Sequence, residues 1–322
     1  MEAEQGAGGV IVTVTPNPAW DVTYPVDELR VGESIRVRAP LGRAGGKGIN
    51  VARVICALGG QALAVAPVRG SRGQLFADSL AADEVPARLV PVPGEVRQSV
   101  AVVPERAATP TGVSQRAEPT VFNEAGEPLG QDSWAALTLA LREVVADSRP
   151  QTVVISGSMP PGTSEEQLRS LVEAGRAEGA RVLVDTSGEA LIWAARAAAD
   201  LVKPNRTEAM DATGEDGVEG AAAALRRLGA GAVVITDGGN GMTAFDGDAV
   251  WRARPADAVS GNPTGAGDAA LAALALSWDR QWPARLRHAI AASAAAVAEP
   301  VAGQVNPAAV AAYESSVDVE EM

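Results

Sequence analysis

The chain has 322 residues, of which 47% are hydrophobic. That length and composition allow the core of one large α/β domain or of two unequal domains, and they exclude a chain that is disordered over most of its length. The formal net charge of −13 excludes the basic surface expected of a nucleic-acid-binding protein. An anionic substrate would therefore need a local cluster of positive groups.

The cysteine content and the apolar pattern point to a reducing compartment. Cys56 is the only cysteine, so it cannot form an internal disulfide. Residues 1–9 lack the positive start and apolar run of a signal peptide, and no apolar stretch reaches membrane-spanning length. The sequence therefore predicts a cytoplasmic protein with no membrane or nucleic-acid partner. We expect residues 1–9 and 301–322 to form flexible or peripheral tails.

The first 130 residues mix strands with one predicted helix. Residues 10–26 form a strand pattern of β-branched residues broken by prolines. A glycine turn then precedes a helix over residues 49–58, whose apolar side chains recur at helical spacing until two glycines end it. Residues 62–68 predict a buried strand. Between residues 88 and 122, short β-like runs separated by proline, threonine and glycine predict an inserted antiparallel sheet.

From residue 132 onward, strands and helices alternate. Strands are expected at residues 152–157, 181–188, 200–205 and 232–239. Helices are expected at residues 132–147, 164–178, from 189, 218–228, 268–276 and 283–298, with a hairpin around residues 246–248. Because strands separated by helices form right-handed crossovers, the pattern predicts a mostly parallel sheet. Its almost continuously apolar strands predict burial on both faces.

Small and polar residues follow four of these strands, in the stretches SGS (156–158), DTSG (185–188), KPN (203–205) and TDGGNG (236–241). In an open parallel sheet, ligands bind beyond the carboxyl ends of the strands. Each stretch alone is also typical of an ordinary turn. Four such stretches on one edge predict a binding cleft.

The stretch AGGKGIN, at residues 44–50, is similar to a phosphate-binding P-loop but lacks its spacing. Three residues rather than four separate Gly42 from Gly46, and Gly48 replaces the hydroxyl residue that would hold magnesium. Consecutive glycines still let a ligand approach the backbone, and the start of the following helix directs amide donors toward it. Lys47 adds a point charge to this region, and Asn50 adds a side-chain amide.

Lysine is rare in the chain. Lys47 and Lys203 are the only lysines among 27 basic residues, and the others are arginine. A general bias toward arginine explains the excess. The two lysines are then candidates for positions that need a compact, flexible ammonium group.

The stretch TGAGDA places an aspartate at the start of a predicted apolar helix. Taken alone, Asp268 is an acidic residue that interacts favourably with the helix dipole. A second interpretation makes the amides of Gly265, Ala266 and Gly267 an anion hole, with Asp268 as a proton acceptor beside it. Such a pair suits phosphoryl transfer, because the donors take up charge on the moving group while the acid accepts a proton from the attacking hydroxyl.

The motifs AGGKGINVAR, SGSMPPG, VKPNRTE and TGAGDA occur in this order. With them, the chain resembles the ribokinase-like PfkB family of carbohydrate kinases over about residues 10–298. It is most similar to the branch that contains 1-phosphofructokinase and tagatose-6-phosphate kinase. The resemblance implies a three-layer α/β/α sandwich with a mostly parallel sheet. It implies one kinase domain over residues 10–300, with a small β-sheet lid from residues 17–44 and 88–125.

The same resemblance implies the roles of individual residues. Asp268 matches the general base, and residues 265–267 match the anion hole. Positions that match sugar contacts are Asp21, Gly45, Gly46 and Asn50. Positions that match nucleotide contacts are Lys203, Asn205, Glu208, Thr236, Asp237, Gly238, Gly239 and Gly241. Asn205 and Glu208 are expected to act on Mg²⁺ indirectly, through water or the γ-phosphate of ATP.

A phosphorylated sugar would need a further anion site. By resemblance, Arg97 on the lid matches the phosphate-binding arginine, Ser156 and Ser158 are the serine candidates, and Lys47 adds charge; an arginine fork suits a phosphate dianion. Alternatively, Arg97 is an exposed strand residue. The lid departs from the branch pattern, because threonine, asparagine and lysine are replaced by Val96, Ser99 and Ala101.

The sequence therefore predicts an ATP- and Mg²⁺-dependent kinase of a ketohexose phosphate, with fructose 1-phosphate as the first candidate and tagatose 6-phosphate as the second. A kinase of an unphosphorylated sugar such as fructose is one alternative, and a catalytically inactive sugar- or nucleotide-binding regulator is another. Potassium dependence stays open, because the stretch NPTGAGDA departs from the family pattern. The exposed lid strands also predict a homodimer through the lid.

Overall fold

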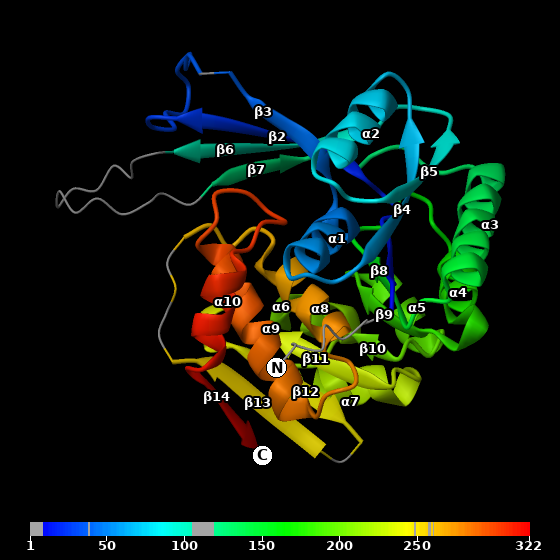
Figure 1. The fold of residues 1–322 in the computed structure, drawn as a ribbon, viewed down its shortest axis with the longest axis vertical. Coiled ribbons are helices and arrows are strands. Elements are labelled where there is room, and N and C mark those ends of the chain that lie inside the picture. The colour runs from blue at the N-terminus through cyan, green and yellow to red at the C-terminus, as the bar shows by residue number, and fades with distance from the viewer. Residues whose placement is uncertain (1–8, 38, 105–118, 248, 257–258, 260) are drawn as a thin grey trace, which may run out of the picture.

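The computed structural model describes residues 9–322 except residues 38, 105–118, 248, 257–258 and 260. Most of the predicted N-terminal tail, part of the second predicted lid segment and one residue of the predicted hairpin lie outside the described residues. The described chain forms a layered body and a smaller sheet that projects from it (Figure 1).

The large sheet has ten strands among the described residues. From one edge to the other, their order is β14 (Val317–Glu321), β13 (Ala249–Pro255), β12 (Met242–Asp246), β11 (Ala232–Thr236), β10 (Leu201–Val202), β9 (Arg181–Asp185), β8 (Thr152–Ser156), β1 (Ile11–Val14), β4 (Ala62–Arg69) and β5 (Ala87–Val92). The strands from β11 to β5 are parallel, whereas β12, β13 and β14 continue the sheet in antiparallel fashion. The predicted α/β class with a mostly parallel sheet is confirmed.

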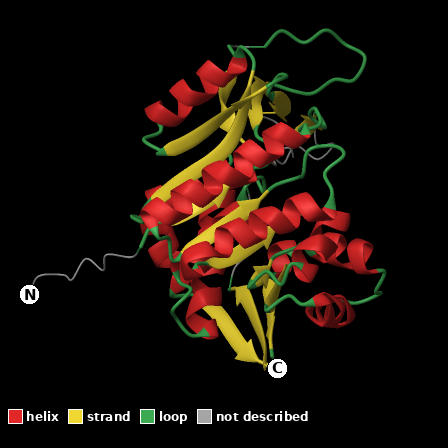
Figure 2. Ribbon diagram, turned by 90° about the vertical axis from the view of Figure 1, so that its right-hand side faces the viewer, coloured by secondary structure: helices red, strands yellow, loops and turns green. Residues whose placement is uncertain are grey.

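Helices cover both faces of the large sheet (Figure 2). One face carries α1 (Lys47–Ala57), α2 (Arg72–Ala82), α8 (Ala266–Leu276), α9 (Trp282–Val297) and α10 (Pro307–Glu314). The other carries α3 (Gln131–Ser148), α4 (Glu165–Arg176) with the 3₁₀ turn η1 (Ala177–Gly179), α5 (Glu189–Arg196), α6 (Arg206–Thr213) and α7 (Val218–Leu228). Each layer of helices buries its own apolar cluster against one face of the sheet. Ligand binding is therefore expected at the carboxyl ends of the strands and not on the faces of the sheet.

The smaller sheet, which we call the lid, has the strand order β3 (Leu41–Gly45), β2 (Ala19–Val26), β6 (Arg97–Pro104) and β7 (Thr120–Asn123). β2 runs parallel to β6, while β3 and β7 pair antiparallel at the two edges. The predicted antiparallel insertion is therefore a mixed sheet, because one of its two central strands comes from the first lid segment. In Figure 1 the lid extends away from the body at the upper left.

Only part of the second predicted lid segment, residues 88–125, belongs to the lid. Its first run is β5, which pairs in parallel with β4 at the edge of the large sheet. Helix α2, which the sequence did not predict, connects these two strands and buries Phe76 and Leu80. A short run such as RLVPV suits either sheet equally well, so local pattern alone could not assign β5 to the body.

The C-terminal residues 301–322, predicted as a flexible or peripheral tail, include helix α10 and the edge strand β14. Helix α10 packs on α9, and β14 forms the edge of the large sheet beside β13. Val310 and Val317 are buried by these contacts. The alternation of valine with acidic residues in VDVEE is typical of a half-buried edge strand, but the run is too short to stand out in sequence.

Candidate active site

An open cleft of about 1640 Å³ lies at the carboxyl ends of the parallel strands and extends under the lid. Its wall is built from five regions of the chain: the lid, the start of α1, the strand ends, the start of α8 and one side of α9. The residues that represent these regions are Asp21, Lys47, Asp185, Asp268 and Ser293. A cleft therefore lies where the polar strand ends predict one.

Helix α8 begins at the floor of this cleft. Gly265 is its N-cap and has a left-handed backbone with φ 88°, and no described side chain caps the helix. A Cβ atom at residue 265 would lie only 2.8 Å from the Ala302 side chain, so glycine is needed for conformation and for space. Gly265, Ala266 and Gly267 all line the cleft, where the first amides of the helix favour an anion.

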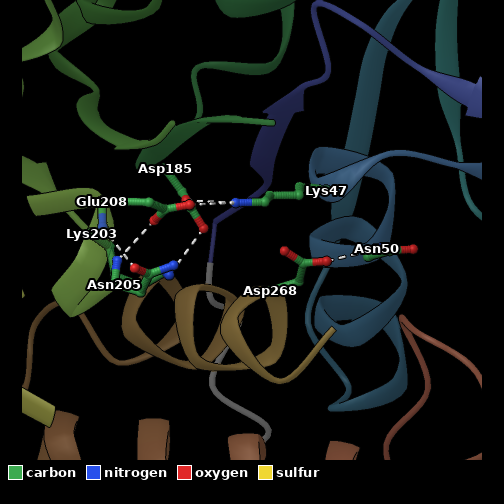
Figure 3. Close-up of polar contacts among 7 residues, drawn as sticks. All are labelled: Lys47, Asn50, Asp185, Lys203, Asn205, Glu208 and Asp268. Atoms are coloured by element: carbon green, nitrogen blue, oxygen red, sulfur yellow. Dashed lines mark hydrogen bonds and ion pairs between the residues drawn. The ribbon is translucent and has the colours of Figure 1, made fainter. Parts of the chain in front are cut away.

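Asp268 lies in the first turn of α8, and its side chain is buried. The Asn50 side-chain amide donates a hydrogen bond of 2.9 Å to its Oδ2 (Figure 3). Burial raises the pKa of Asp268 to about 6, although Lys47 and the Asn50 hydrogen bond lower it. This carboxylate is therefore ionised at neutral pH yet basic enough to accept a hydroxyl proton. Asn50, which the sequence predicts as a sugar contact, orients the carboxylate.

Asp185 is a buried carboxylate at the end of β9 that binds both lysines of the chain. Lys203 Nζ lies 3.0 Å from Oδ2, and Lys47 Nζ lies 3.2 Å from Oδ1 (Figure 3). Burial alone would raise the pKa of Asp185, but the two ammonium groups outweigh it and hold the pKa below its ordinary value. The sequence marks DTSG as a polar strand end but does not predict Asp185 as a site residue.

Asn205 and Glu208 form a capping box at the start of α6. The Asn205 side-chain oxygen accepts a hydrogen bond of 2.8 Å from the backbone N–H of Glu208. The Glu208 carboxylate accepts one of 2.9 Å from the backbone N–H of Asn205. Both residues line the cleft, so the box fixes two oxygen groups there. The described residues contain no cluster of three or more acidic, histidine or cysteine side chains suited to a metal. These oxygens fit Mg²⁺ that keeps its waters and phosphate ligands.

The glycine loop after β11 divides into four residues that line the cleft and two, Asp237 and Asn240, that do not. Those that line it are Thr236, Gly238, Gly239 and Gly241, around the 3₁₀ turn η2 (Gly238–Asn240). The Asp237 carboxylate instead accepts hydrogen bonds from Arg206 and Asn240. The cleft is also lined by residues of α9 that the sequence does not predict, namely Ile290, Ser293, Ala294 and Val297. Alanine-rich helices carry no local signal for such contacts.

The lid side of the cleft carries Asp21, on the central strand β2. A Cβ atom at residue 45 would overlap the Asp21 carboxylate, so Gly45 permits its close approach. Burial raises the pKa of Asp21 to about 6, although Arg97, Arg53 and Arg43 lower it. A ligand that forms hydrogen bonds with the Asp21 carboxyl group would therefore compensate for its burial.

Arg97 is held at the edge of the same region. Its Nε donates to the Asn17 carbonyl at 3.2 Å, and its Nη1 donates to the Glu124 carbonyl at 3.1 Å. Asn17, which the sequence does not predict, also donates to the Ser158 hydroxyl at 3.3 Å. Ser158 lines the cleft, whereas Ser156 is fully buried within β8. Of the two serine candidates, the structure therefore places only Ser158 at the site.

Comparison with known proteins tests whether the chain belongs to the family predicted from its motifs. A sequence model described as pfkB family carbohydrate kinase matches residues 17–309. The chain belongs to the pfkB family of carbohydrate kinases. This confirms the family predicted from the motifs, and it makes the chain an ATP-dependent sugar kinase.

Two curated relatives in the pfkB family cover most of the chain. The ATP-dependent 6-phosphofructokinase isozyme 2 of Escherichia coli is 33% identical over 273 residues, which are 83% of this chain and 84% of the relative. The 1-phosphofructokinase of Xanthomonas campestris is 35% identical over 274 residues, which are 82% of each chain. These two relatives carry the names of two different phosphofructokinase activities.

Solved structures agree with this fold. Phosphofructokinase-2 from Escherichia coli in complex with potassium has a TM-score of 0.84 at 30% identity. The same protein in complex with fructose-6-phosphate has a TM-score of 0.81. Each comparison covers 95% of this chain and 98% of the other. The predicted ribokinase-like arrangement of body and lid is confirmed.

The pKa of Asp268 predicts an acid limb in the pH profile of this pfkB kinase. As the pH falls through about 6, the carboxylate is protonated and cannot accept the hydroxyl proton, so kcat/KM decreases. Asp21, with a pKa of about 6, contributes to the same limb. The measurement is kcat/KM against pH for wild type and Asp21→Asn, which should keep the contribution of Asp268. A wild-type profile that is flat well below pH 6 would contradict the raised pKa.

Proposed function

We propose that the chain transfers the γ-phosphoryl group of ATP to the free primary hydroxyl of a fructose monophosphate, giving fructose 1,6-bisphosphate. One observation carries the proposal: a single cleft contains the buried base Asp268 at one end and the anchored Arg97 beside Asp21 at the lid. The first group suits proton removal from an acceptor hydroxyl, and the second suits the phosphate that the acceptor already bears.

The relatives widen the set of candidate acceptors. Fructose 1-phosphate and tagatose 6-phosphate are the sugars favoured by sequence, and the name of the Escherichia coli relative adds fructose 6-phosphate. All three have a free primary hydroxyl at the end opposite the phosphate, so phosphorylation of each gives a ketohexose 1,6-bisphosphate. A site with a base at one end and a phosphate contact at the other suits any of them.

In the proposed reaction, Asp268 accepts the proton of the sugar hydroxyl while its oxygen forms a bond to the γ-phosphorus. The bond from that phosphorus to the bridging oxygen breaks, and ADP leaves. The amides at the start of α8 take up negative charge on the moving phosphoryl group. Asn205 and Glu208 would hold Mg²⁺ through water and phosphate oxygens, and the ion would neutralise phosphate charge. Because a relative is described with potassium, titration of KCl against kcat would test that cation.

The acceptor side is proposed to bind the sugar through its hydroxyls and its phosphate. Asp21 would accept hydrogen bonds from sugar hydroxyls close to the backbone of Gly45 and Gly46. Arg97 keeps its Nη2 group free of the two carbonyl contacts that fix the plane of the guanidinium. That group and the Ser158 hydroxyl would bind the phosphate.

Replacing Arg97 by methionine should weaken binding of phosphorylated acceptors only. A lost charged hydrogen bond predicts a KM for the fructose monophosphate that rises about 10- to 100-fold, whereas any KM for free fructose should hardly change. The measurement is coupled ADP release with fructose 1-phosphate, fructose 6-phosphate, tagatose 6-phosphate and fructose. Arg88→Met is the matched control, because Arg88 is exposed on β5 and pairs with Glu143 outside the cleft.

The same panel separates the rival functions. Turnover of unphosphorylated sugars alone, with no effect of Arg97→Met on KM, would replace the proposal by a free-sugar kinase. Binding of sugar and ATP without ADP release would favour the regulator.

We also propose a cytoplasmic homodimer that associates through the lid. The lid exposes Leu41 and Phe122, with 62% and 60% of their surfaces accessible. Phosphofructokinase-2 from Escherichia coli is described as tetrameric in an inhibited form, so assembly occurs in a relative. No helix among the described residues is long and apolar enough to cross a membrane. Light scattering would test the dimer.

A further inference from the structure

The two lysines of the chain approach one carboxylate from opposite sides. Lys203 is almost fully buried and binds Asp185 Oδ2, whereas the Lys47 side chain is 41% exposed and binds Oδ1 from the cleft (Figure 3). All other basic residues except histidine are arginine, so both lysine side chains of the molecule meet at this point. Asp185 therefore holds the Lys47 ammonium group at the cleft surface.

Lys47 also lies among the groups that surround the reaction. Its Nζ is 4.0 Å from Glu208 Oε1, on the side of the nucleotide-binding capping box. Asp185 chiefly, together with Asp268 and Glu208, raises the pKa of Lys47 although partial desolvation lowers it, so the side chain stays charged over the working pH range. A lysine with a raised pKa is unsuited to proton transfer and suited to the role of a fixed positive charge.

The charged neighbours of Lys47 differ from those of Arg97. The carboxylates that act on Arg97 are Asp21 and Glu124, which belong to the lid region. Those that act on Lys47 lie at the strand ends and at the starts of α6 and α8. The sequence assigns Lys47 to the phosphate of the sugar together with Arg97. In the structure the Lys47 ammonium group instead binds Asp185 and lies near Glu208, whereas Arg97 is held by the carbonyls of Asn17 and Glu124.

We propose that Lys47 is a catalytic residue that contacts the phosphoryl group in transit from ATP to the sugar, and that Asp185 positions it there. This inference rests on the proposed phosphoryl transfer at Asp268. As the new oxygen–phosphorus bond forms and the bond to ADP breaks, negative charge spreads over the three outer oxygens of that group. The Lys47 ammonium group, which Asp185 holds near Glu208, neutralises this charge.

The choice of lysine over arginine follows from the shapes of the two groups. An ammonium group is compact and its stem is flexible, so it can contact one carboxylate oxygen and follow a moving phosphoryl oxygen. A guanidinium group presents its donors in a rigid planar fork, which suits a bidentate contact with one stationary carboxylate or phosphate. Because Lys47 is the first residue of α1, its backbone is fixed while its side chain reaches across the cleft.

The test is the kinetics of Lys47→Met with the best acceptor found for the wild type. Loss of one transition-state contact predicts a kcat about 10²- to 10³-fold lower, with little change in KM for the sugar phosphate. Because the positive charge of Lys47 lowers the pKa of Asp268, the acid limb of the pH profile should move to higher pH in the variant. A residue that served only folding would not move this limb.

A second variant keeps the test decisive if Lys47→Met folds poorly. Lys47→Cys treated with 2-bromoethylamine regains an ammonium group on a stem of nearly the same length, and kcat should recover. Wild type receives the same treatment as the control, because Cys56 is also a thiol. A rise in the KM of the phosphorylated acceptor with kcat unchanged would overturn the proposal and assign Lys47 to the sugar phosphate. Failure of the aminoethyl side chain to restore kcat would also overturn it.

The role of Lys47 can be tested whichever sugar the wild type phosphorylates. If the wild type phosphorylates only an unphosphorylated sugar, the proposed function fails, but the Lys47 variants can still be tested with that sugar. If the wild type converts a fructose monophosphate and Lys47→Met leaves kcat and the acid limb unchanged, only the role of Lys47 fails.

Discussion

Asp268→Asn should lower kcat by about 10²- to 10⁴-fold, the range that general-base catalysis contributes. The substitution keeps the shape of the side chain but removes the proton-accepting carboxylate at the start of α8. Binding of sugar and nucleotide should remain close to wild type, because neither depends on proton transfer. The measurement combines steady-state kinetics with calorimetric binding of both ligands.

The control for this variant is Asp78→Asn, which makes the same chemical change at an exposed position of α2, where Asp78 accepts a hydrogen bond from Gln74. Its kcat should equal that of the wild type. Turnover by Asp268→Asn at the wild-type rate would refute the assignment of the base, and a loss of ligand binding without a change in kcat would make Asp268 a binding residue instead.

Gly265→Ala should lower kcat by about 10²- to 10³-fold, as expected when a preorganised anion hole loses a donor. The backbone at residue 265 has φ 88°, and the new methyl group would lie 2.8 Å from the Ala302 Cβ, so the start of α8 must shift. The strained conformation should also lower the free energy of unfolding by about 1–3 kcal/mol. Kinetics and thermal unfolding measure the two effects separately.

Gly130→Ala provides the matched comparison. Gly130 is also a helix N-cap, but its φ is −63° and a Cβ atom there would meet no described atom within 4 Å. That variant should be stable and fully active. If Gly265→Ala is destabilised but turns over at the wild-type rate, the α8 amides do not stabilise the moving phosphoryl group.

Much of the body could be predicted because its elements have strong local patterns. The helix expected at residues 218–228 is α7, and the continuous apolar runs of β8, β9 and β11 are buried strands of a parallel sheet. Pairing between distant segments has no such local signal. The assignment of β5 to the body, the parallel β2–β6 pair and the edge strand β14 all depend on it.

The residues of the candidate site likewise divide into those that have a local sequence signal and those that have none. Glycine-rich motifs at helix starts identify Gly46 and Gly265, because the positive φ of both residues favours glycine. Asp185 and Asn17 were missed because each becomes distinctive through a partner far away in the sequence, which is Lys47 for Asp185 and Ser158 for Asn17. Ser156 is a strand residue whose side chain is buried in the sheet, whereas Ser158 lies beyond the strand end and lines the cleft.

The most direct test of the proposed function is identification of the reaction product by phosphorus NMR. Purified protein is incubated with ATP, Mg²⁺ and either fructose 1-phosphate or fructose 6-phosphate, with fructose in a parallel sample. We expect resonances of ADP and fructose 1,6-bisphosphate in at least one monophosphate sample, and their loss with Asp268→Asn. A wild-type product formed only from fructose, or inorganic phosphate without a bisphosphate, would contradict the proposal.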